Sequence, residues 1–321
     1  MNNYISAKYP VVEIIIVNWN GLPDTIECIA SMKKITYPNY KITVVDNGSA
    51  GNDSAMLEQE FGDYIDVIKS TRNLGFTGGC NIGIRQALDK GSDYVLLLNN
   101  DTVVASDFLS EMIKAAESDK EVGIAGAKIY NYGTNQIQFV WGGIDFYRGQ
   151  PTYTPKYVIE RFREGPIDKG QYDDLKYVDW ASGCSLLIKS DLIKTIGVLD
   201  ETFFALLEEV EYCTRARKSG YKVVYVPAAK VWHKWGKSTG VVSGFTVYYG
   251  TRNRFWLMKK YASKWQHCCF NIYFFGLYTW FAVAYYMLFA RNPRIVIDLF
   301  HGIRDGVAGS NIYAPEILPD Q

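Results

Sequence analysis

The segment Tyr94–Asp101, which reads YVLLLNND, decides the fold of this chain. Its five apolar residues are followed at once by two asparagines and an aspartate. A near-continuous apolar run of this length is typical of a strand that is buried on both faces, as in a parallel sheet. We therefore expect a strand over Tyr94–Leu98, with a polar site at its carboxyl end.

Three further strands are predicted upstream of this one, and each ends near polar residues. They are Val11–Val17 (VVEIIIV) before Asn18, Lys41–Val45 (KITVV) before Asp46, and Tyr64–Ile68 (YIDVI) before residues 70–73. Helical stretches at about 24–33, 53–61 and 79–90 separate the four strands. This alternation predicts a doubly wound, mostly parallel α/β sheet with helices on both faces. Ligands of open parallel sheets bind at the carboxyl ends of strands, so Asn18, Asp46 and Asp101 indicate a polar ligand such as a nucleotide.

Composition narrows the class of protein. The 321 residues contain 34 Lys and Arg against 34 Asp and Glu, so there is no basic excess for binding nucleic acid. The six cysteines form no CxxC pair, which offers neither a zinc ribbon nor a redox motif and suits reduced thiols in a cytosolic compartment. The N-terminus, MNNYISAKYP, lacks an apolar signal core, so we expect no secretion signal.

The amino-acid composition changes twice in the second half of the chain. Residues 128–179 are rich in Tyr, Gly and charge and predict loops and short strands that cover the site. A strand over Ser185–Ile188, an acidic helix over about Leu207–Ser219 and a strand over Lys222–Val226 follow. We expect an α/β domain over 1–250, with a first half at about 11–127 and a second half at about 128–250. A C-terminal helical region would cover 251–321.

The 23 residues from Cys268 to Ala290 contain no Asp, Glu, Lys or Arg, and ten of them are aromatic. As a helix they would be roughly 35 Å long, enough to cross a bilayer, and aromatic rings prefer the membrane interface. A buried aromatic helix or an oligomer contact is the alternative. We expect membrane association from the cytoplasmic face through residues 268–290, as a spanning or an in-plane helix. The oligomeric state stays open.

Three polar motifs have both a chemical and a structural interpretation. Asp101 can hold a divalent cation against a diphosphate, or it can form an Asx turn or helix cap. Glu208 and Glu209 open a predicted helix, where a carboxylate can act as a general base or be a solvated charge that suits the helix N-terminus. His233 ends a predicted strand beside aromatic and basic residues, as a metal ligand or as a structural histidine.

The glycine-rich segment Asn73–Asn81, NLGFTGGCN, matches neither the dinucleotide-binding fingerprint nor the phosphate loop. This counts against a dinucleotide dehydrogenase and against a phosphate-loop kinase.

Seven motifs taken in order resemble the inverting family 2 glycosyltransferases of GT-A fold, in particular their rhamnosyltransferase-like branch. The motifs are IIIVNWNG (14–21), VVDNGS (44–49), NLGFTGGCNIGI (73–84), LLLNND (96–101), DWASGCSLLIK (179–189), LDETFFALLEEVEYCTRA (199–216) and VWHKWGKS (231–238). The resemblance covers about residues 11–255, and it implies a nucleotide-sugar half at about 11–127 and an acceptor half at about 128–250. It implies a nucleotide-sugar donor, with dTDP-rhamnose or a UDP-sugar as candidates, and a glycan or lipid-linked acceptor.

The resemblance also implies site residues. Donor contacts would come from Asn18, Asp46, Asn73, Gly75, Phe76 and Asn99, and Lys234 or Lys237 could add positive charge near the diphosphate. Asp101 and His233 would hold Mg²⁺ or Mn²⁺, which neutralises the leaving diphosphate. Asn99 stands where the family often has the first aspartate of its metal motif. Ser182, Gly183 and Cys184 would form the loop that faces the acceptor.

The resemblance assigns the general base to Glu209, the second carboxylate of a pair. A base on the ring face opposite the leaving group takes the acceptor's proton in a single inverting displacement. We expect like-charge repulsion from Glu208 and Glu211 to raise the pKa of Glu209. Glu208 is the rival base, because helical spacing places it on one face with Glu211.

Two other functions remain open at this stage. A sugar nucleotidyltransferase would favour a basic, glycine-rich loop near the N-terminus, but Val17–Asp24 (VNWNGLPD) contains no Lys or Arg. A non-catalytic, membrane-bound carbohydrate-binding module could keep the same fold, since fold does not determine function. The presence of Asp101, Glu209 and His233 together argues against such a module.

Overall fold

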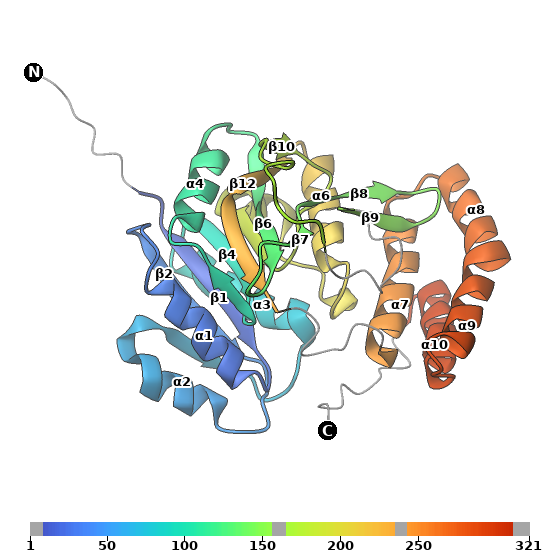
Figure 1. Cartoon of the computed structure of the whole chain (residues 1–321), viewed down its shortest axis with the longest axis horizontal. Coiled ribbons are helices and arrows are strands. Elements are labelled where there is room, and N and C mark those ends of the chain that lie inside the picture. The colour runs from blue at the N-terminus through green and yellow to red at the C-terminus, as the bar shows by residue number, and fades with distance from the viewer. Residues whose placement is uncertain (1–8, 156–164, 235–242, 311–321) are drawn as a thin grey trace, which may run out of the picture.

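The computed structural model describes residues 9–155, 165–234 and 243–310 and is built around one large sheet (Figure 1). Strands β1 (Val12–Asn18), β2 (Tyr40–Asp46), β3 (Asp66–Lys69) and β4 (Tyr94–Asn99) alternate with helices α1 (Leu22–Met32), α2 (Asp53–Phe61) and α3 (Gly75–Asp89). β1 and β4 are buried along almost their whole length, as expected for strands covered on both faces. The predicted alternation of strands and helices is confirmed.

The strand order explains why the polar ends meet. The sheet runs β10 (Lys176–Tyr177), β12 (Lys222–His233), β6 (Val122–Asn131), β11 (Ser185–Lys189), β4, β1, β2, β3. β1 pairs in parallel with both β2 and β4, and β12 pairs in parallel with β6. β11 lies between β4 and β6 and is antiparallel to both, so β6 has the same direction as β4. β12, which is parallel to β6, therefore also has the direction of β4. The carboxyl ends of β1, β2, β4 and β12 therefore lie at one edge of the sheet.

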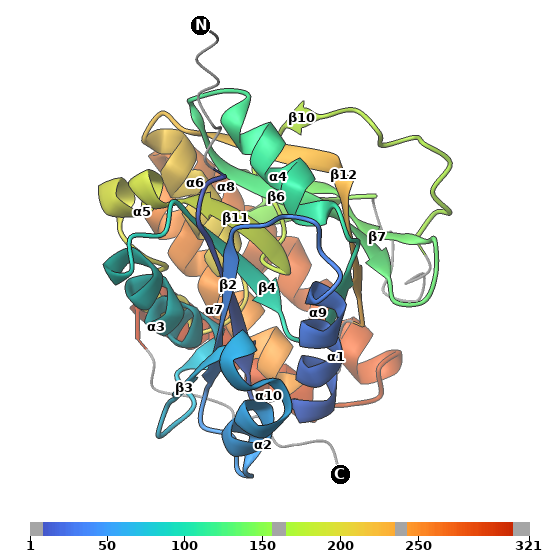
Figure 2. The ribbon, with the colours of Figure 1, turned by 90° about the vertical axis from the view of Figure 1, so that its left-hand side faces the viewer.

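Helices cover both faces of this sheet (Figure 2). Right-handed crossovers place α1 and α2 on one face, and the return from β3 to β4 places α3 on the other. Helices α4 (Phe108–Glu117) and α6 (Glu208–Lys218) both pack against β12. The predicted fold class, a doubly wound and mostly parallel sheet with helices on both faces, is confirmed.

The remaining short elements lie mostly around the second half of the sheet. They are η1 (Gly62–Tyr64), β5 (Thr102–Val104), β7 (Ile137–Phe139), β8 (Trp141–Asp145), β9 (Gln150–Thr154), α5 (Ser190–Ile196) and η2 (Glu201–Phe203). β8 and β9 form a separate antiparallel hairpin, as the prediction of short strands for this region implied.

Two elements extend beyond their predicted bounds. α3 begins at Gly75 rather than at residue 79, because the Asn73 side chain accepts a hydrogen bond from the Gly75 amide at 2.8 Å and so starts the helix early. β12 runs without a break from Lys222 to His233, with a register shift between Val226 and Lys230.

Four helical elements and one π-helical turn form the C-terminal region. They are α7 (Gly244–Tyr261), α8 (Lys264–Tyr273), η3 (Phe274–Tyr278), α9 (Thr279–Leu288) and α10 (Arg294–Ala308). Figure 1 shows them gathered on the side of the molecule away from α1 and α2. The domain boundary expected near residue 250 falls inside α7, which continues through it. The division into an enzyme domain and a C-terminal region thus stays a prediction.

Elements α8, η3 and α9 form one continuous helix over Lys264–Leu288, which is long and apolar enough to cross a membrane. One face of this helix, with Phe270, Phe274 and Ala282, is buried against α7 and α10. The opposite face exposes large apolar side chains, namely Ile272, Leu277, Trp280, Phe281 and Leu288. The helix therefore packs side-on against the protein body and leaves one apolar face uncovered.

Side-on packing predicts different stability effects for two phenylalanines of this helix. Phe274 is fully buried, whereas the side chain of Phe281 is 70% exposed. Phe274→Ala should lower the free energy of unfolding by about 3–5 kcal/mol, because it leaves a cavity between helices. Phe281→Ala, the matched control, should change it by less than about 0.5 kcal/mol. Denaturant titration in detergent micelles measures both, and equally small effects would mean that the helix does not dock on the body.

Candidate active site

A cleft of about 320 Å³ opens at the carboxyl edge of the sheet. It is lined by most of the residues that the sequence singled out: Asn73, Gly75, Phe76, Asn99, Asp101, Ser182, Gly183, Cys184, Glu208, Glu209 and His233. These residues come from segments far apart in the chain, which the sheet topology brings to one edge.

Asp101 and His233 meet in a buried corner of this cleft. The Nε2 atom of His233 lies 3.1 Å from Oδ1 of Asp101 and 3.3 Å from Nδ2 of Asn99. The Lys234 amide donates to the Asp101 carbonyl at 3.0 Å, which ties the end of β12 to the residues that follow β4. Burial alone would raise the pKa of the Asp101 carboxyl, but the hydrogen bond and charge of His233, a backbone hydrogen bond and the charge of Lys234 together outweigh burial and lower that pKa.

Gln138 orients the His233 ring. Its Oε1 atom lies 2.7 Å from Nδ1 of His233, and an amide oxygen can only accept, so Nδ1 carries the proton. Nε2 then faces Asp101 and the cleft; its hydrogen bond to the Asp101 carboxylate uses a proton on Nε2, which the ring would release on ligating a metal. No sequence motif points to Gln138, because it lies on β7 at the edge of the sheet and contacts the histidine only through the fold.

The residues in this corner fit a divalent cation as partial ligands. A carboxylate oxygen, an imidazole nitrogen and the buried Oδ1 of Asn99, which has no hydrogen-bond partner, suit Mg²⁺ or Mn²⁺. Within residues 9–155, 165–234 and 243–310, no group of three or more His, Cys, Asp or Glu side chains could hold a metal ion. The protein would therefore need a ligand such as a diphosphate to complete the coordination.

Glu208 and Glu209 begin α6, and their carboxylates line the cleft. In each of them the buried Oε2 atom has no hydrogen-bond partner among the described residues. Burial raises the pKa of Glu209 to about 7. Burial, followed by repulsion from Glu209, raises the pKa of Glu208 well above its usual range. The expected rise in the pKa of Glu209 is present, but its cause is burial rather than like-charge repulsion.

Glu211 does not take part in this carboxylate pair. Its carboxylate is buried in ion pairs with Arg215, at 3.0 Å, and with Lys260, at 2.9 Å. It anchors α6 to α7 instead of raising the pKa of Glu209.

The carboxylates are positioned by an unusual loop, Phe203–Leu207, which directly precedes α6. Phe204, Leu206 and Leu207 have φ values of 62°, 69° and 68°, a left-handed conformation that costs free energy in residues other than glycine. The side chain of Asn253 holds this loop by donating to the carbonyls of Phe203, Ala205 and Leu206 at 2.6–3.0 Å.

The same loop contacts the start of α3. The Phe204 carbonyl accepts hydrogen bonds from the Thr77 amide and hydroxyl, both at 3.1 Å. A Cβ atom at position 75 would collide with that carbonyl, and Gly75 has a φ of +74°, so this position requires glycine. The loop therefore links the predicted donor loop, the carboxylate pair and α7.

Four predicted residues do not line the cleft. Asn18 is fully buried, and its side chain bonds Thr25, Ser49 and Asp53. Asp46 is buried behind the cleft and has one carboxylate oxygen without a partner. Lys234 forms ion pairs with Asp24 and Glu27, so its charge is already balanced. Lys237 lies outside the described residues.

Several lining residues were not predicted from the sequence: Val17, Trp19, Asn47, Asn100, Phe204, Ala205, Leu206 and Phe245. Asn47 could have been predicted from the sequence, since it follows Asp46 in the motif VVDNGS (44–49). Its side chain donates to the Asn73 side chain at 3.0 Å and to the Gly75 carbonyl at 2.9 Å, and so shapes the donor loop.

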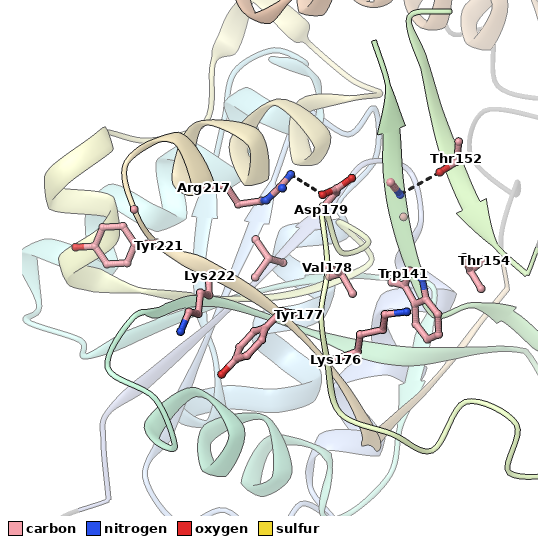
Figure 3. Close-up of a pocket in the computed structure, with 14 residues that line it drawn as sticks. Trp141, Thr152, Thr154, Lys176, Tyr177, Val178, Asp179, Arg217, Tyr221 and Lys222 are labelled. Atoms are coloured by element: carbon pink, nitrogen blue, oxygen red, sulfur yellow. Dashed lines mark hydrogen bonds and ion pairs between the residues drawn. The ribbon is translucent and has the colours of Figure 1, made fainter. Parts of the chain in front are cut away.

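A larger cleft of about 530 Å³ lies between the β8–β9 hairpin and β12 (Figure 3). Most of its charged groups are already paired, and Lys176 lies over the ring of Trp141 at 4.6 Å. Arg217 points at Asp179, at 2.7 Å, and Lys222 forms ion pairs with Asp119 and Glu121. None of the predicted site residues lines this cleft, so we do not place the chemistry there.

A third cleft of about 400 Å³ adjoins the candidate active site. It lies between β9 and the helices α7 and α9, and it shares Leu206 and Glu209 with the first cleft. Glu209 is therefore positioned between two cavities, whereas Glu208 lines only the first.

This strand order is typical of glycosyltransferases of GT-A type. So are an aspartate and a histidine that can ligate a metal, and a separate carboxylate, at the carboxyl edge of the sheet. The family model for glycosyl transferase family 2 matches residues 13–173, and the chain belongs to this family. Both the enzyme class and the family expected from the sequence motifs are confirmed.

Relatives and a solved structure agree with this assignment. A low-salt glycan biosynthesis hexosyltransferase of Haloferax volcanii is 27% identical over 92% of this chain and 91% of its own length. The N-acetylglucosaminyl-diphospho-decaprenol L-rhamnosyltransferase of Mycobacterium tuberculosis is 24% identical over 72% of this chain and 78% of its own. The fold is also that of a Pyrobaculum calidifontis mannosyltransferase, solved in complex with GDP-Man and Mn²⁺, with a TM-score of 0.58, 12% identity and coverage of 95% of this chain and 89% of that one.

Proposed function

We propose that this glycosyltransferase moves a sugar from a nucleotide-sugar donor to an acceptor hydroxyl in one inverting step. The observation that carries the proposal is that Asp101, His233 and Glu209 line a single cleft although they come from different elements. A metal-type pair can balance charge on the leaving diphosphate, and a separate carboxylate can take the acceptor's proton. A carbohydrate-binding module would have no use for two unpaired buried carboxylates.

The donor would lie over the α3 end of the cleft. Trp19 and Phe76 are half-buried ring systems that line it and can stack on a base. Asn73 and Gly75 shape the loop beneath. Asp46 is fully buried and does not line the cleft, so no donor contact is assigned to it. Because the relatives include a hexosyltransferase and a rhamnosyltransferase, we propose a hexose or deoxyhexose donor, with dTDP-rhamnose among the candidates.

Asp101 and His233, with Asn99 beside them, would hold Mg²⁺ or Mn²⁺ together with the donor diphosphate. When bound, the cation stabilises the negative charge that develops on the leaving nucleoside diphosphate. Asp101 is suited to this role because its lowered pKa keeps it ionised at neutral pH.

Glu209 would accept the proton of the acceptor hydroxyl while that oxygen attacks the anomeric carbon. The bond from this carbon to the diphosphate oxygen breaks in the same step, and the configuration at the carbon inverts. Glu208 is less suited, because it lines only the first cleft, and burial and repulsion from Glu209 raise its pKa well above its usual range. Gly183 lies against Glu209, where a Cβ atom would come within 3.5 Å of the glutamate Cβ, so the 182–184 loop would hold the acceptor beside the base.

We also propose that the enzyme works at the cytoplasmic face of a membrane. The helix Lys264–Leu288 presents an apolar face with Trp280 and Phe281, and exposed Lys264 and Arg294 flank it. Because its other face packs along α7 and α10, an in-plane position at the lipid interface explains the structure better than a transmembrane span. The four buried free cysteines fit a reducing compartment. The acceptor would be a glycan, most simply a lipid-linked one.

Metal binding should depend on the nucleotide. Since the protein offers too few ligands for a complete site, Mn²⁺ should bind at least tenfold more tightly in the presence of UDP or dTDP than alone. Asp101→Ala should remove most of the transfer activity and this nucleotide-dependent binding, whereas Asp179→Asn, outside the cleft, should retain both. Electron paramagnetic resonance titration of Mn²⁺ measures the binding, and unchanged turnover in excess EDTA would contradict the metal role.

The pH dependence of transfer should report the titration of Glu209. Because burial raises its pKa to about 7, the carboxyl is protonated below that pH and cannot accept a proton. The rate should therefore fall about tenfold per pH unit below pH 7. Glu209→Gln should lose roughly 10²-fold or more in kcat and also this acid limb, while donor binding is retained. If Glu208→Gln shows that loss instead, the base is Glu208.

Membrane binding should depend on the exposed apolar face. The double variant Trp280→Glu, Phe281→Glu should bind vesicles of phosphatidylglycerol at least tenfold more weakly, because it places two charges in the interface. Met56→Glu, an exposed apolar position on α2, is the control and should bind as the unaltered protein does. Vesicle flotation measures the binding, and an unaltered protein that stays wholly in the soluble fraction would refute the proposal.

A further inference from the structure

The cleft between β9, α7 and α9 has an uncompensated buried cation. Arg254 lines this cleft and is 7% exposed. Its Nε atom donates to the Gly149 carbonyl at 2.8 Å, and Nη2 donates to the Arg148 carbonyl at 3.1 Å. The guanidinium has five N–H donors, so several are left for a ligand.

No carboxylate in the described part of the chain forms an ion pair with Arg254. Its other neighbours are the rings of Tyr278, at 4.4 Å, and Phe274, at 5.1 Å. A buried charge without a counter-charge costs free energy, and an anion in the cleft would compensate it. A diphosphate fits this demand well, because guanidinium binds phosphate oxygens in a bidentate manner.

Part of the cleft wall belongs to the helix that carries the apolar surface. Tyr278 and Tyr286 line the cleft and belong to the helix Lys264–Leu288, whose opposite face is the exposed apolar one. Glu209 lines both this cleft and the donor cleft. The cleft therefore brings together a helix with an apolar surface, a buried cation and the proposed base.

We propose that this cleft binds the acceptor as a lipid-linked glycosyl diphosphate. Arg254 binds the diphosphate, the lipid chain leaves along Tyr278 and Tyr286 toward the membrane-facing helix, and the acceptor sugar places its hydroxyl at Glu209. The inference rests on the proposed function, since it uses Glu209 as the base and a lipid-linked acceptor. It adds the location of the acceptor site and the chemical group that the site recognises.

The test places a charge in the cleft without disturbing its walls. Arg254 also holds the β8–β9 hairpin, so a change there would alter structure and binding together. Gly250 lines the same cleft on α7, and a Cβ atom at this position would meet no atom within 4 Å. Gly250→Glu places a carboxylate near the diphosphate, and Gly250→Gln is its neutral, equally large control. Both also replace a helical glycine, which favours the helix.

The probe is farnesyl diphosphate, with farnesol as the matched probe that lacks phosphate. Binding is measured by calorimetry in EDTA, so that a cation in the donor cleft cannot hold the diphosphate. We expect farnesyl diphosphate to bind the unaltered protein at least tenfold more tightly than farnesol does. Gly250→Glu should weaken farnesyl diphosphate binding at least tenfold relative to Gly250→Gln, because the added carboxylate repels the diphosphate and competes with it for Arg254. Farnesol should bind both variants equally.

The failure of this inference differs from a failure of the proposed function. Equal affinity for the two probes, or equal losses in the two Gly250 variants, would overturn the acceptor site. Binding of UDP or dTDP with Mn²⁺ is measured in parallel on the same samples and uses the other cleft. If neither nucleotide binds the unaltered protein, the proposed function fails, whatever the farnesyl probes show.

Discussion

The functional geometry of this protein depends on one constraint, the left-handed loop Phe203–Leu207. Three non-glycine residues there adopt positive φ values, and the side chain of Asn253 compensates their cost by bonding three loop carbonyls. The loop carbonyl of Phe204 in turn caps the start of α3. The nucleotide-binding edge, the carboxylate pair and the C-terminal helices are therefore held by the same five residues, although they lie far apart in the chain.

This arrangement connects the C-terminal helices to the sheet. Arg252 and Asn253 of α7 fix the loop that precedes Glu209, and Arg254, the next residue, lines the neighbouring cleft. Successive residues of one helix thus contact the structure around both clefts. Burial at the start of α6 raises the pKa of Glu209 to about 7, so a carboxylate becomes a proton acceptor suited to neutral pH.

Much of the fold could be predicted from the sequence, because strands buried on both faces appear as apolar runs and their polar ends mark the ligand edge. Asp101 and His233 stand at such strand ends, whereas the glutamate pair was predicted from its place at a helix start and from the family resemblance. The contributions of Gln138 and Asn253 could not be, since each acts through a contact that only the fold creates. Lys234 resembled a phosphate contact, but Asp24 and Glu27, some two hundred residues away in sequence, bind it. The polar residues Arg252 and Asn253, in the middle of an otherwise largely apolar helix, were a sequence signal that α7 binds the loop Phe203–Leu207.

The central claim is that a single displacement occurs between a leaving diphosphate held at Asp101 and a base at Glu209. The anomeric configuration of the first glycoside formed, compared with that of the donor, tests this most directly, because it does not depend on which sugar is transferred. Proton NMR of the product gives that configuration, because a glycoside does not mutarotate. The account predicts inversion. Retention would require a second nucleophile or a different attack geometry, and would contradict the proposed role of Glu209.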